Sequence, residues 1–235
     1  MANYDPRTLF MKQEAKQIQT LFSRISKPYD MLNHVFSFGI DIWWRKILVR
    51  HVASCKPALV LDLATGSGDV ALMMRKAGLK VVGADFCVPM LEEARRKGFS
   101  PVIAADALQL PFTDGSFNAV TVAYGLRNFV DRPSAMGEVL RVLRPGGHFF
   151  ILEFSRPWKF LRPFYNFYLE TLMPWVTQKA AGEKDAYNYL ASSIQAFPAQ
   201  KELADLLEAN GFKNVSFQNL TMGISALHMG EKPLG

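Results

Sequence analysis

The stretch LDLATGSGDVA at residues 61–71 constrains the fold of this chain more than any other. It has the form of a short apolar strand, a turn that contains Gly66 and Gly68, and the first turn of a helix. The two glycines allow the backbone to approach a ligand closely, and the helix N-terminus offers free N–H groups. In open α/β sheets ligands bind at the carboxyl ends of strands, so this stretch predicts a binding site there.

The rest of the chain continues this alternation of strands and helices. Short apolar runs predict strands at residues 58–63, 80–85, 101–105, 117–123 and 148–153. Helical patterns lie between them, at residues 69–77, 89–97 and 131–143. Strands that are separated by helices form right-handed crossovers and therefore a parallel sheet. Gly146 and Gly147 are expected to form the turn after the last of these helices.

The two ends of the chain depart from the alternation. Residues 7–26 and 41–53 show the apolar spacing of helices, and residues 158–198 are rich in aromatic side chains and predicted to be helical, as a cover over an apolar surface. A helix at 199–210 precedes two final strands, at 212–220 and 223–229. Because no helix separates these two strands, they must be antiparallel, and the sheet is mixed at that edge.

Composition excludes several classes of protein. A chain that is 49% hydrophobic and 20% charged is globular, and no window approaches the about 20 uninterrupted apolar residues of a membrane span. The N-terminus lacks the apolar core of a secretory signal. Cys55 and Cys87 form neither a disulfide framework nor, with the four histidines, a spaced zinc cluster, so we expect no metal and a cytoplasmic location.

The net charge of +6 belongs almost wholly to the N-terminal part. Residues 1–60 hold nine Lys and Arg against four Asp and Glu, whereas the later parts of the chain are nearly balanced. A basic end attracts nucleic acid, anionic lipid or an acidic partner, or only aids solubility. Nucleic acid is not expected, because no basic stripe is interleaved with base-stacking aromatic residues.

Charge also separates two interpretations of the glycine turn. The turn satisfies the dinucleotide fingerprint, with Asp85 at the end of the next strand for a ribose diol. However, Asp62 and Asp69 flank the turn and would repel a pyrophosphate. S-adenosylmethionine carries no phosphate but has a sulfonium and an ammonium group, so the acidic turn favours this methyl donor over NAD.

A further acid follows the third predicted strand. The carboxylate of Asp106 can accept a hydrogen bond from an adenine amino group while the N–H of Ala107 addresses a ring nitrogen. The alternative is that Asp106 only initiates a turn.

Several motifs together resemble one family. They are YDMLNHVFSFG within residues 22–46, the glycine turn at 61–69, residues 105–112, GLRN within 123–128, LEFSRP within 141–157, residues 186–198 and residues 219–230. The chain resembles the ubiquinone/menaquinone biosynthesis C-methyltransferase family of class I S-adenosylmethionine-dependent enzymes.

The resemblance implies a Rossmann-like α/β fold with a seven-stranded, mostly parallel sheet whose last strand is antiparallel, plus N-terminal helices and a helical lid. We expect a single domain over residues 1–235. An N-terminal helical cover spans residues 1–56, and a core that binds the methyl donor spans 57–156. A helical acceptor lid spans 157–198, and the last helix with two strands spans 199–235.

Residues of the methyl-donor site follow from the turn and from the resemblance. The predicted set is Asp62, Gly66, Ser67, Gly68, Asp85, Phe86, Asp106, Ala107 and Ala123. Two of these positions depart from the family pattern. The family often has Thr where this chain has Ser67, and Ser where it has Ala123. Alanine at position 123 lacks the hydroxyl through which a serine there would contact the donor.

The implied reaction is C-methylation of a polyprenylated quinol, either a demethylmenaquinol or a methoxy-benzoquinol ubiquinone precursor. Arg127 is expected to stabilise the phenolate that forms, with Asn128 beside it and Tyr29 hydrogen-bonded to the ring oxygen. Salt-bridge formation by Arg127 and core packing by Tyr29 are the alternatives. The base stays open among Asp30, Glu153, His228 and a water relay.

Two other functions fit the same residues: methylation of another small apolar acceptor, and a non-catalytic subunit that only binds the methyl donor.

The polyprenyl tail suggests that the protein contacts the inner face of the membrane transiently. Basic residues of the N-terminal helix would then meet anionic head groups: Lys12, Lys16, Arg24 and Lys27. The alternative is that this helix only packs on the sheet. Other quinone-biosynthesis enzymes and a second copy of the chain are further expected partners.

Overall fold

The computed structural model describes residues 39–172 and 184–234, together with Lys16, Thr20, Ser23 and Ser37. Nearly all of the helix expected at residues 7–26 therefore lies outside the described residues, as do Tyr29 and Asp30. The helix expected at 41–53 is present as α3 (Ile40–Ser54).

One sheet of seven strands forms the centre of the described part. Its strands are β1 (Val60–Leu63), β2 (Val81–Asp85), β3 (Val102–Ala104), β4 (Phe117–Ala123), β5 (Leu143–Phe154), β6 (Lys213–Leu220) and β7 (Ser225–Glu231). They lie in the order β3-β2-β1-β4-β5-β7-β6. Strands β1 to β5 are parallel, and β7 runs antiparallel to both β5 and β6. The mixed edge predicted from the sequence is confirmed.

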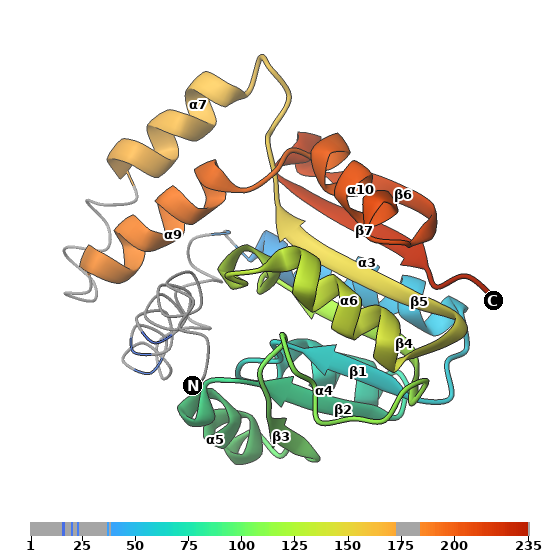
Figure 1. Ribbon diagram of the computed structural model, residues 1–235. Helices are drawn as coiled ribbons and strands as arrows, with labels where there is room; N and C mark the ends of the chain where they lie inside the picture. The colour runs from blue at the N-terminus through green and yellow to red at the C-terminus, as the bar shows by residue number, and fades with distance from the viewer. Residues whose placement is uncertain are drawn as a thin grey trace, which may run out of the picture.

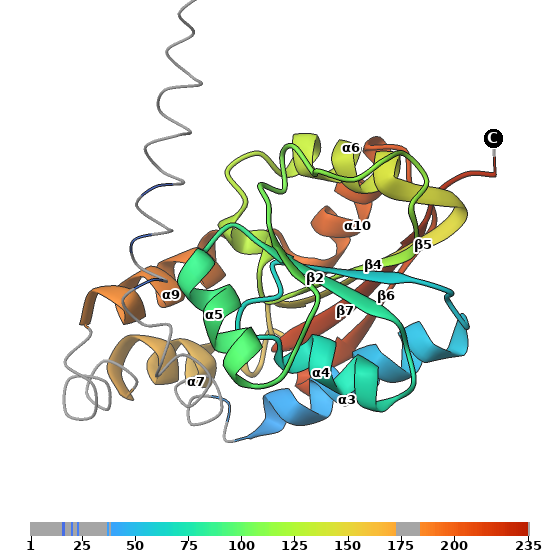
Figure 2. The ribbon, with the colours of Figure 1, turned by 90° about the horizontal axis from the view of Figure 1, so that it is seen from below.

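Helices cover both faces of this sheet, as Figures 1 and 2 show. One face carries α3, α4 (Asp69–Lys76) and α5 (Val88–Arg96), and the other carries α6 (Arg132–Val142) and α10 (Gln200–Ala209). Buried side chains such as Leu48 and Met74 form the core on the first side, and Val139 and Leu203 belong to the core on the second. Because both faces are closed, the carboxyl ends of the parallel strands are the natural place for a ligand.

The boundary between α6 and β5 differs from the expectation. The sequence predicts a turn at Gly146 and Gly147, yet the helix ends at Val142 and the strand begins directly at Leu143. The pairing of β4 with β5 shifts register there, since Phe117 pairs with Leu143 and Ala119 with His148. The two glycines therefore lie in an irregularity inside the strand. Gly146 has a positive φ of 73°, and its N–H donates to the carbonyl of Lys232.

The region expected to form a helical lid contains helices outside the sheet layers. They are α7 (Arg162–Phe167), a π-helical turn (Tyr168–Leu172) and α9 (Lys184–Ala196). In Figure 1, α7 and α9 lie side by side, beyond the end of the sheet at which β5 ends. Residues 173–183 of the predicted lid lie outside the described residues.

Candidate active site

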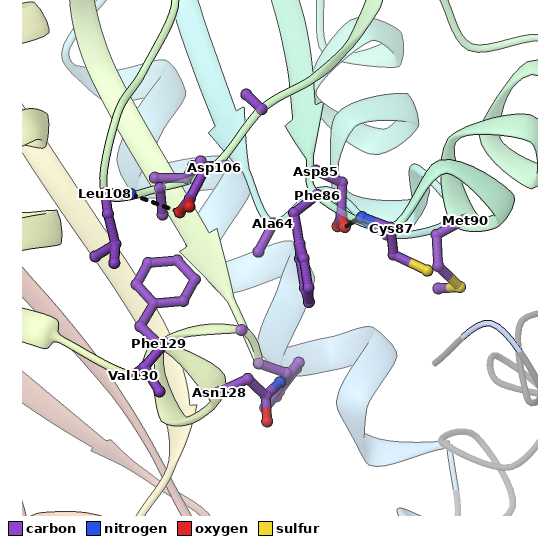
Figure 3. Close-up of a pocket in the computed structure, with 16 residues that line it drawn as sticks. Ala64, Asp85, Phe86, Cys87, Met90, Asp106, Leu108, Asn128, Phe129 and Val130 are labelled. Carbon is purple, nitrogen blue, oxygen red and sulfur yellow. Dashed lines mark hydrogen bonds between the residues drawn. The ribbon is translucent and has the colours of Figure 1, made fainter. Parts of the chain in front are cut away.

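A cavity of about 260 Å³ opens at the carboxyl ends of the parallel strands (Figure 3). The residues around it follow β1, β2, β3 and β4, so four separate loops form one site. Six of the predicted site residues line it: Gly66, Asp85, Phe86, Asp106, Ala107 and Asn128. Five do not: Asp62, Ser67, Gly68, Ala123 and Arg127.

The glycine turn has the left-handed backbone that its sequence predicts. Gly66 has a φ of +56° and Gly68 a φ of +82°, and Ala64, which is not a glycine, has a φ of +55°. The two glycines serve different purposes. A Cβ on Gly68 would lie 3.1 Å from the Cβ of Ala94 in α5, so this glycine permits close packing of the turn on a helix. Gly66 lines the cavity, where its small size keeps space open.

Asp85 ties two of the four loops together. Its Oδ2 accepts a hydrogen bond from the N–H of Gly66, and its Oδ1 accepts one from the N–H of Cys87, both at 2.8 Å. Burial raises the pKa of this carboxyl group, and the backbone donors oppose that effect. The two backbone hydrogen bonds orient the side chain of Asp85. Because each carboxylate oxygen has a second lone pair, Asp85 can also accept a hydrogen bond from a ligand.

The two acids that flank the turn do not act as the sequence argument assumed. Asp62 is buried and accepts from the hydroxyls of Thr65 and Thr121, both at 2.6 Å, and its burial raises its pKa to about 6. Asp69 is paired with Arg45 at 2.8 Å and with Lys97 at 2.7 Å. The negative charge of Asp69 is therefore offset by two cations, and the carboxylate of Asp62 faces two hydroxyl groups and does not line the cavity.

Asp106 lies at the mouth of the cavity on a loop that α6 holds in place. Its Oδ1 accepts from the N–H of Leu108 at 2.9 Å, which makes the side chain part of a local turn as well as of the cavity wall. Glu138 of α6 accepts from the N–H of Leu110 at 2.7 Å, and Arg141 donates to the Leu110 and Phe112 carbonyls. The position of Asp106 therefore depends on a helix more than 25 residues away in the sequence.

Arg127 is buried in an ion pair. Its side chain is 2% exposed, and its Nη1 lies 2.8 Å from Oε1 of Glu153 in β5. The same nitrogen donates to the carbonyl of Tyr124, and the guanidinium lies over the ring of Phe154. The alternative prediction, that Arg127 forms a salt bridge, is thus confirmed. The salt bridge is buried, whereas a surface salt bridge was expected.

Asn128, the next residue, faces the cavity. It belongs to the 3-10 turn η1 (Leu126–Asn128), and its Oδ1 accepts a hydrogen bond from the hydroxyl of Tyr189 in α9 at 3.0 Å. In Figure 3 the amide nitrogen of Asn128 lies on the side of Phe86 and its oxygen points away. Sequence reasoning placed Tyr189 in the lid but missed this contact, because no local pattern indicates which lid residue reaches the site.

Apolar residues complete the wall. Those that sequence reasoning did not single out include Cys87, Met90, Leu108, Phe129 and Val130. Phe129 and Val130 directly follow Asn128. This apolar pair after the GLRN motif is the sequence signal from which the apolar wall could have been predicted. The thiol of Cys87 lies 3.5 Å from the hydroxyl of Ser23, and burial raises its pKa.

Two candidates for the base lie away from the cavity. Glu153 is engaged by Arg127, and His228 is buried in β7 with its Nε2 2.8 Å from the carbonyl oxygen of Gln200. Neither residue lines the cavity. Within the described part of the chain, no cluster of three or more His, Cys, Asp and Glu side chains could hold a metal ion.

Strand order, the antiparallel β7 and a cavity at the carboxyl ends of β1 to β4 together define the fold of class I S-adenosylmethionine-dependent methyltransferases. A solved SAM-dependent methyltransferase from Thermotoga maritima matches with a TM-score of 0.65 and 20% sequence identity, over 91% of this chain and 99% of that chain. A second, from Methanosarcina mazei, matches with a TM-score of 0.55 and 23% identity, over 75% and 93%.

Sequence comparison narrows this class to one family. The pattern of the ubiE/COQ5 methyltransferase family matches residues 10–232, and the chain therefore belongs to that family. It is similar to a protein named demethylmenaquinone methyltransferase from Thermus thermophilus, with 45% identity over 91% of this chain and all of the relative. A Geotalea uraniireducens protein, named ubiquinone/menaquinone biosynthesis C-methyltransferase UbiE, is 38% identical over 94% of this chain and 99% of the relative.

Proposed function

We propose that this methyltransferase moves a methyl group from S-adenosylmethionine to a ring carbon of a polyprenylated quinol, with demethylmenaquinol as the first acceptor to test. The observation that supports this best is family membership over residues 10–232, together with relatives named for that reaction. The cavity adds support, because two carboxylates and an apolar wall suit a cationic nucleoside and an apolar ring.

The methyl donor would be held by Asp85 and by the loop at Asp106. We propose that Asp85 accepts from ribose hydroxyls, with Asp106 and the N–H of Ala107 addressing the adenine edge and Leu108 and Phe129 providing apolar surface. When bound, the donor would supply an electrophilic methyl group on sulfur. A ring carbon beside an ionised quinol hydroxyl would bond to this methyl group as the S–CH₃ bond breaks and S-adenosylhomocysteine leaves, and the same ring carbon would then lose its proton to the base. An apolar wall helps, because phenolate and sulfonium charges disappear in the reaction.

Asn128 is the residue we assign to the ionised hydroxyl. Tyr189 donates to its oxygen, which leaves the amide NH₂ group as a hydrogen-bond donor toward the cavity. Arg127 then acts as a positioning residue, since its contacts with Tyr124 and Glu153 hold the turn that carries Asn128. Because Glu153 and His228 do not line the cavity, Asp30 and a water relay are the candidates that stay for the base.

The proposed reaction can be tested by mass spectrometry with methyl-labelled S-adenosylmethionine. Chemically reduced short-chain demethylmenaquinol and the methoxy-benzoquinol precursor are supplied in parallel reactions. We expect label on a ring carbon of demethylmenaquinol. Label only on the benzoquinol would identify the benzoquinol as the acceptor in place of demethylmenaquinol. If neither quinol is labelled although the protein binds the methyl donor, another apolar acceptor or a non-catalytic subunit would be favoured.

The role of Tyr189 can be tested separately. Tyr189→Phe removes the hydroxyl that orients Asn128, so we expect kcat to fall about tenfold while the Kd for S-adenosylmethionine stays unchanged. Tyr165→Phe, the same substitution on the neighbouring helix α7, is the matched control and should leave kcat unchanged. A lower affinity for the methyl donor in Tyr189→Phe with normal kcat would contradict the assignment.

No helix in the described ranges is long and apolar enough to cross a bilayer. We propose that the enzyme works in the cytoplasm and contacts the inner face of the membrane transiently, because its polyprenyl substrate dissolves in lipid. Association with other quinone-biosynthesis enzymes and a dimeric state are further proposals. Of the basic residues expected to face lipid, Lys12, Arg24 and Lys27 lie outside the described residues, and Lys16 is exposed.

A further inference from the structure

The segment from Trp158 to Phe167, which includes α7, exposes an unusual amount of aromatic surface. Trp158, Phe160, Phe164 and Phe167 are 51%, 63%, 73% and 64% exposed. In the described part of the chain, only two other tryptophan or phenylalanine side chains, Trp43 and Phe217, are exposed large hydrophobics. We call these four side chains the aromatic surface. Single exposed apolar side chains are common on protein surfaces, whereas a cluster of four within ten residues indicates a binding surface.

Positive charge accompanies this aromatic surface. Lys159 and Arg162 are exposed between the aromatic residues, and no Asp or Glu occurs from residue 154 to 169. Aromatic rings interleaved with lysine and arginine suit the boundary between anionic lipid head groups and acyl chains, where rings insert and cations meet phosphate. The same charges would repel one another across an interface between two copies of this surface.

The segment that carries the aromatic surface lies on the same side of the molecule as the lid helix that contacts the active site. The N–H of Trp158 donates to the carbonyl of Met222, which fastens the segment to the turn between β6 and β7, just beyond the carboxyl end of β5. Helix α7 lies beside α9 in Figures 1 and 2, and Tyr189 of α9 contacts Asn128 at the cavity. A substrate that leaves a bilayer at this surface would therefore emerge beside α9, the helix that contacts the methyl-transfer site.

We propose that the aromatic surface docks the enzyme on an anionic lipid bilayer, with Phe160, Phe164 and Phe167 inserted among the lipids and Lys159 and Arg162 at the head groups. The sequence predicts a lipid contact at the N-terminal basic segment, most of which lies outside the described residues. The contact at α7 and the residues before it is additional and rests on their own exposed rings and charges. The proposal rests on the proposed function, which supplies the reason for docking: a polyprenyl acceptor that resides in the bilayer.

The test is co-sedimentation of the full chain with vesicles of phosphatidylcholine alone and of phosphatidylcholine mixed with phosphatidylglycerol. We expect binding to the mixed vesicles that weakens with added salt. The triple variant F160S/F164S/F167S should bind about tenfold more weakly or worse, since each inserted ring contributes through its buried apolar area. The double variant K159E/R162E should lose binding to the mixed vesicles specifically.

Matched controls carry the same changes elsewhere. Phe217→Ser removes an exposed ring from β6, and K76E/K80E reverses two exposed charges near the end of α4. Both should bind vesicles like the parent chain. Equal loss of binding in the controls, or unchanged binding in the triple variant, would overturn the proposal. So would a dimer of the parent chain that the triple variant converts to monomers while neither binds vesicles, because the surface would then join two copies.

Methyl transfer to a soluble short-chain quinol separates this proposal from the proposed function. The triple variant should retain that activity, because the soluble acceptor reaches the site without a bilayer, and should lose activity only with long-chain quinol in vesicles. Loss of both activities in a folded triple variant would contradict docking as the role of these residues. If the parent chain binds mixed vesicles but methylates no quinol, the proposed function fails and the docking surface stands.

Discussion

Charges at the active site are set by partners that lie far away in the sequence. Asp69 was expected to present a negative charge beside the glycine turn, and in the fold it is neutralised by Arg45 and Lys97. Arg127 was expected to meet the substrate, and in the fold it meets Glu153. The family match supports S-adenosylmethionine as the methyl donor. The predicted negative charge of Asp69 beside the glycine turn, which had favoured this donor over NAD, was wrong. Asp85 and Asp106 are the acids that line the cavity.

The buried pair of Arg127 and Glu153 predicts a large effect on stability. Arg127→Met should lower the free energy of unfolding by about 3–5 kcal/mol, because it leaves Glu153 buried without its cation. Adding Glu153→Gln should restore part of the loss, as urea denaturation would show. Lys201→Met removes an exposed pair with Asp205 and should leave the midpoint unchanged. Normal stability with abolished turnover in Arg127→Met would instead indicate direct action on the substrate.

His228 predicts a specific pH dependence of stability. Burial lowers its pKa from 6.5 to about 4, and its Nδ1 has no hydrogen-bond partner among the described residues. The unfolded chain therefore binds a proton more readily than the folded chain, so stability is present above pH 6.5 and is lost as the pH falls toward 4. The loss from this group should reach about 3 kcal/mol.

His228→Gln should remove that slope, as denaturation at a series of pH values would show. Asp62, whose raised pKa of about 6 gives a slope of opposite sign between pH 3.8 and 6, is present in both chains and cancels in the difference. Parallel curves for the two chains across this range would contradict the burial argument.

At the scale of elements, the site depends on how closely the ends of neighbouring strands approach. Ala64 after β1 and Tyr124 after β4 both have positive φ values, 55° and 58°, which are strained for residues other than glycine. A Cβ on Gly125 would lie only 2.6 Å from the Cβ of Ala64. Gly125 is needed for space, since its own φ of −114° suits any residue.

Gly125→Ala should therefore separate the ends of β1 and β4. We expect a loss of about 1–3 kcal/mol in stability and weaker binding of S-adenosylmethionine, measured by denaturation and calorimetry. Gly137→Ala in α6 is the matched control. Nothing lies within 4 Å of the Cβ it would add, and alanine in a helix should raise stability by about 1 kcal/mol. Unchanged binding in Gly125→Ala would show that the strand ends adjust freely.

At the scale of the whole molecule, the last two strands join the sheet that the first five begin. Strand β7 pairs with β5 from His148 to Phe154, so residues 199–235 are not a separate unit. Side chains from both halves of the chain share each core, as Leu48 and Leu227 do on one face and Val120 and Leu207 on the other. From this arrangement we propose that the chain folds as a single domain.

A single domain predicts one cooperative unfolding transition. Far-ultraviolet circular dichroism and tryptophan fluorescence should give coincident curves in urea. S-adenosylmethionine at a concentration of about 100 times its Kd should shift both by about 2.7 kcal/mol. Two separate transitions, or a shift seen with only one probe, would contradict a single domain.

The sequence by itself determined the fold class, the antiparallel pairing of the last two strands and the family. The fold class and the pairing follow from local patterns: the period of apolar residues, the glycines of one turn, and the absence of a helix between the last two strands. The family was indicated by a resemblance that whole motifs carry, among them GLRN and LEFSRP. It also singled out Gly66, Asp85, Asp106 and Asn128, which line the cavity, because each lies at or within a few residues of the carboxyl end of a strand.

Only the tertiary structure decided which of the charged residues face the ligand and which face one another. The pairing of Arg127 with Glu153, the hydrogen bond from Tyr189 to Asn128 and the contact of Gly125 with Ala64 each join residues on different elements. Electrostatic and packing energies depend on distance in space, and the folded sheet brings these residues within a few ångströms of one another, whatever their separation in the chain.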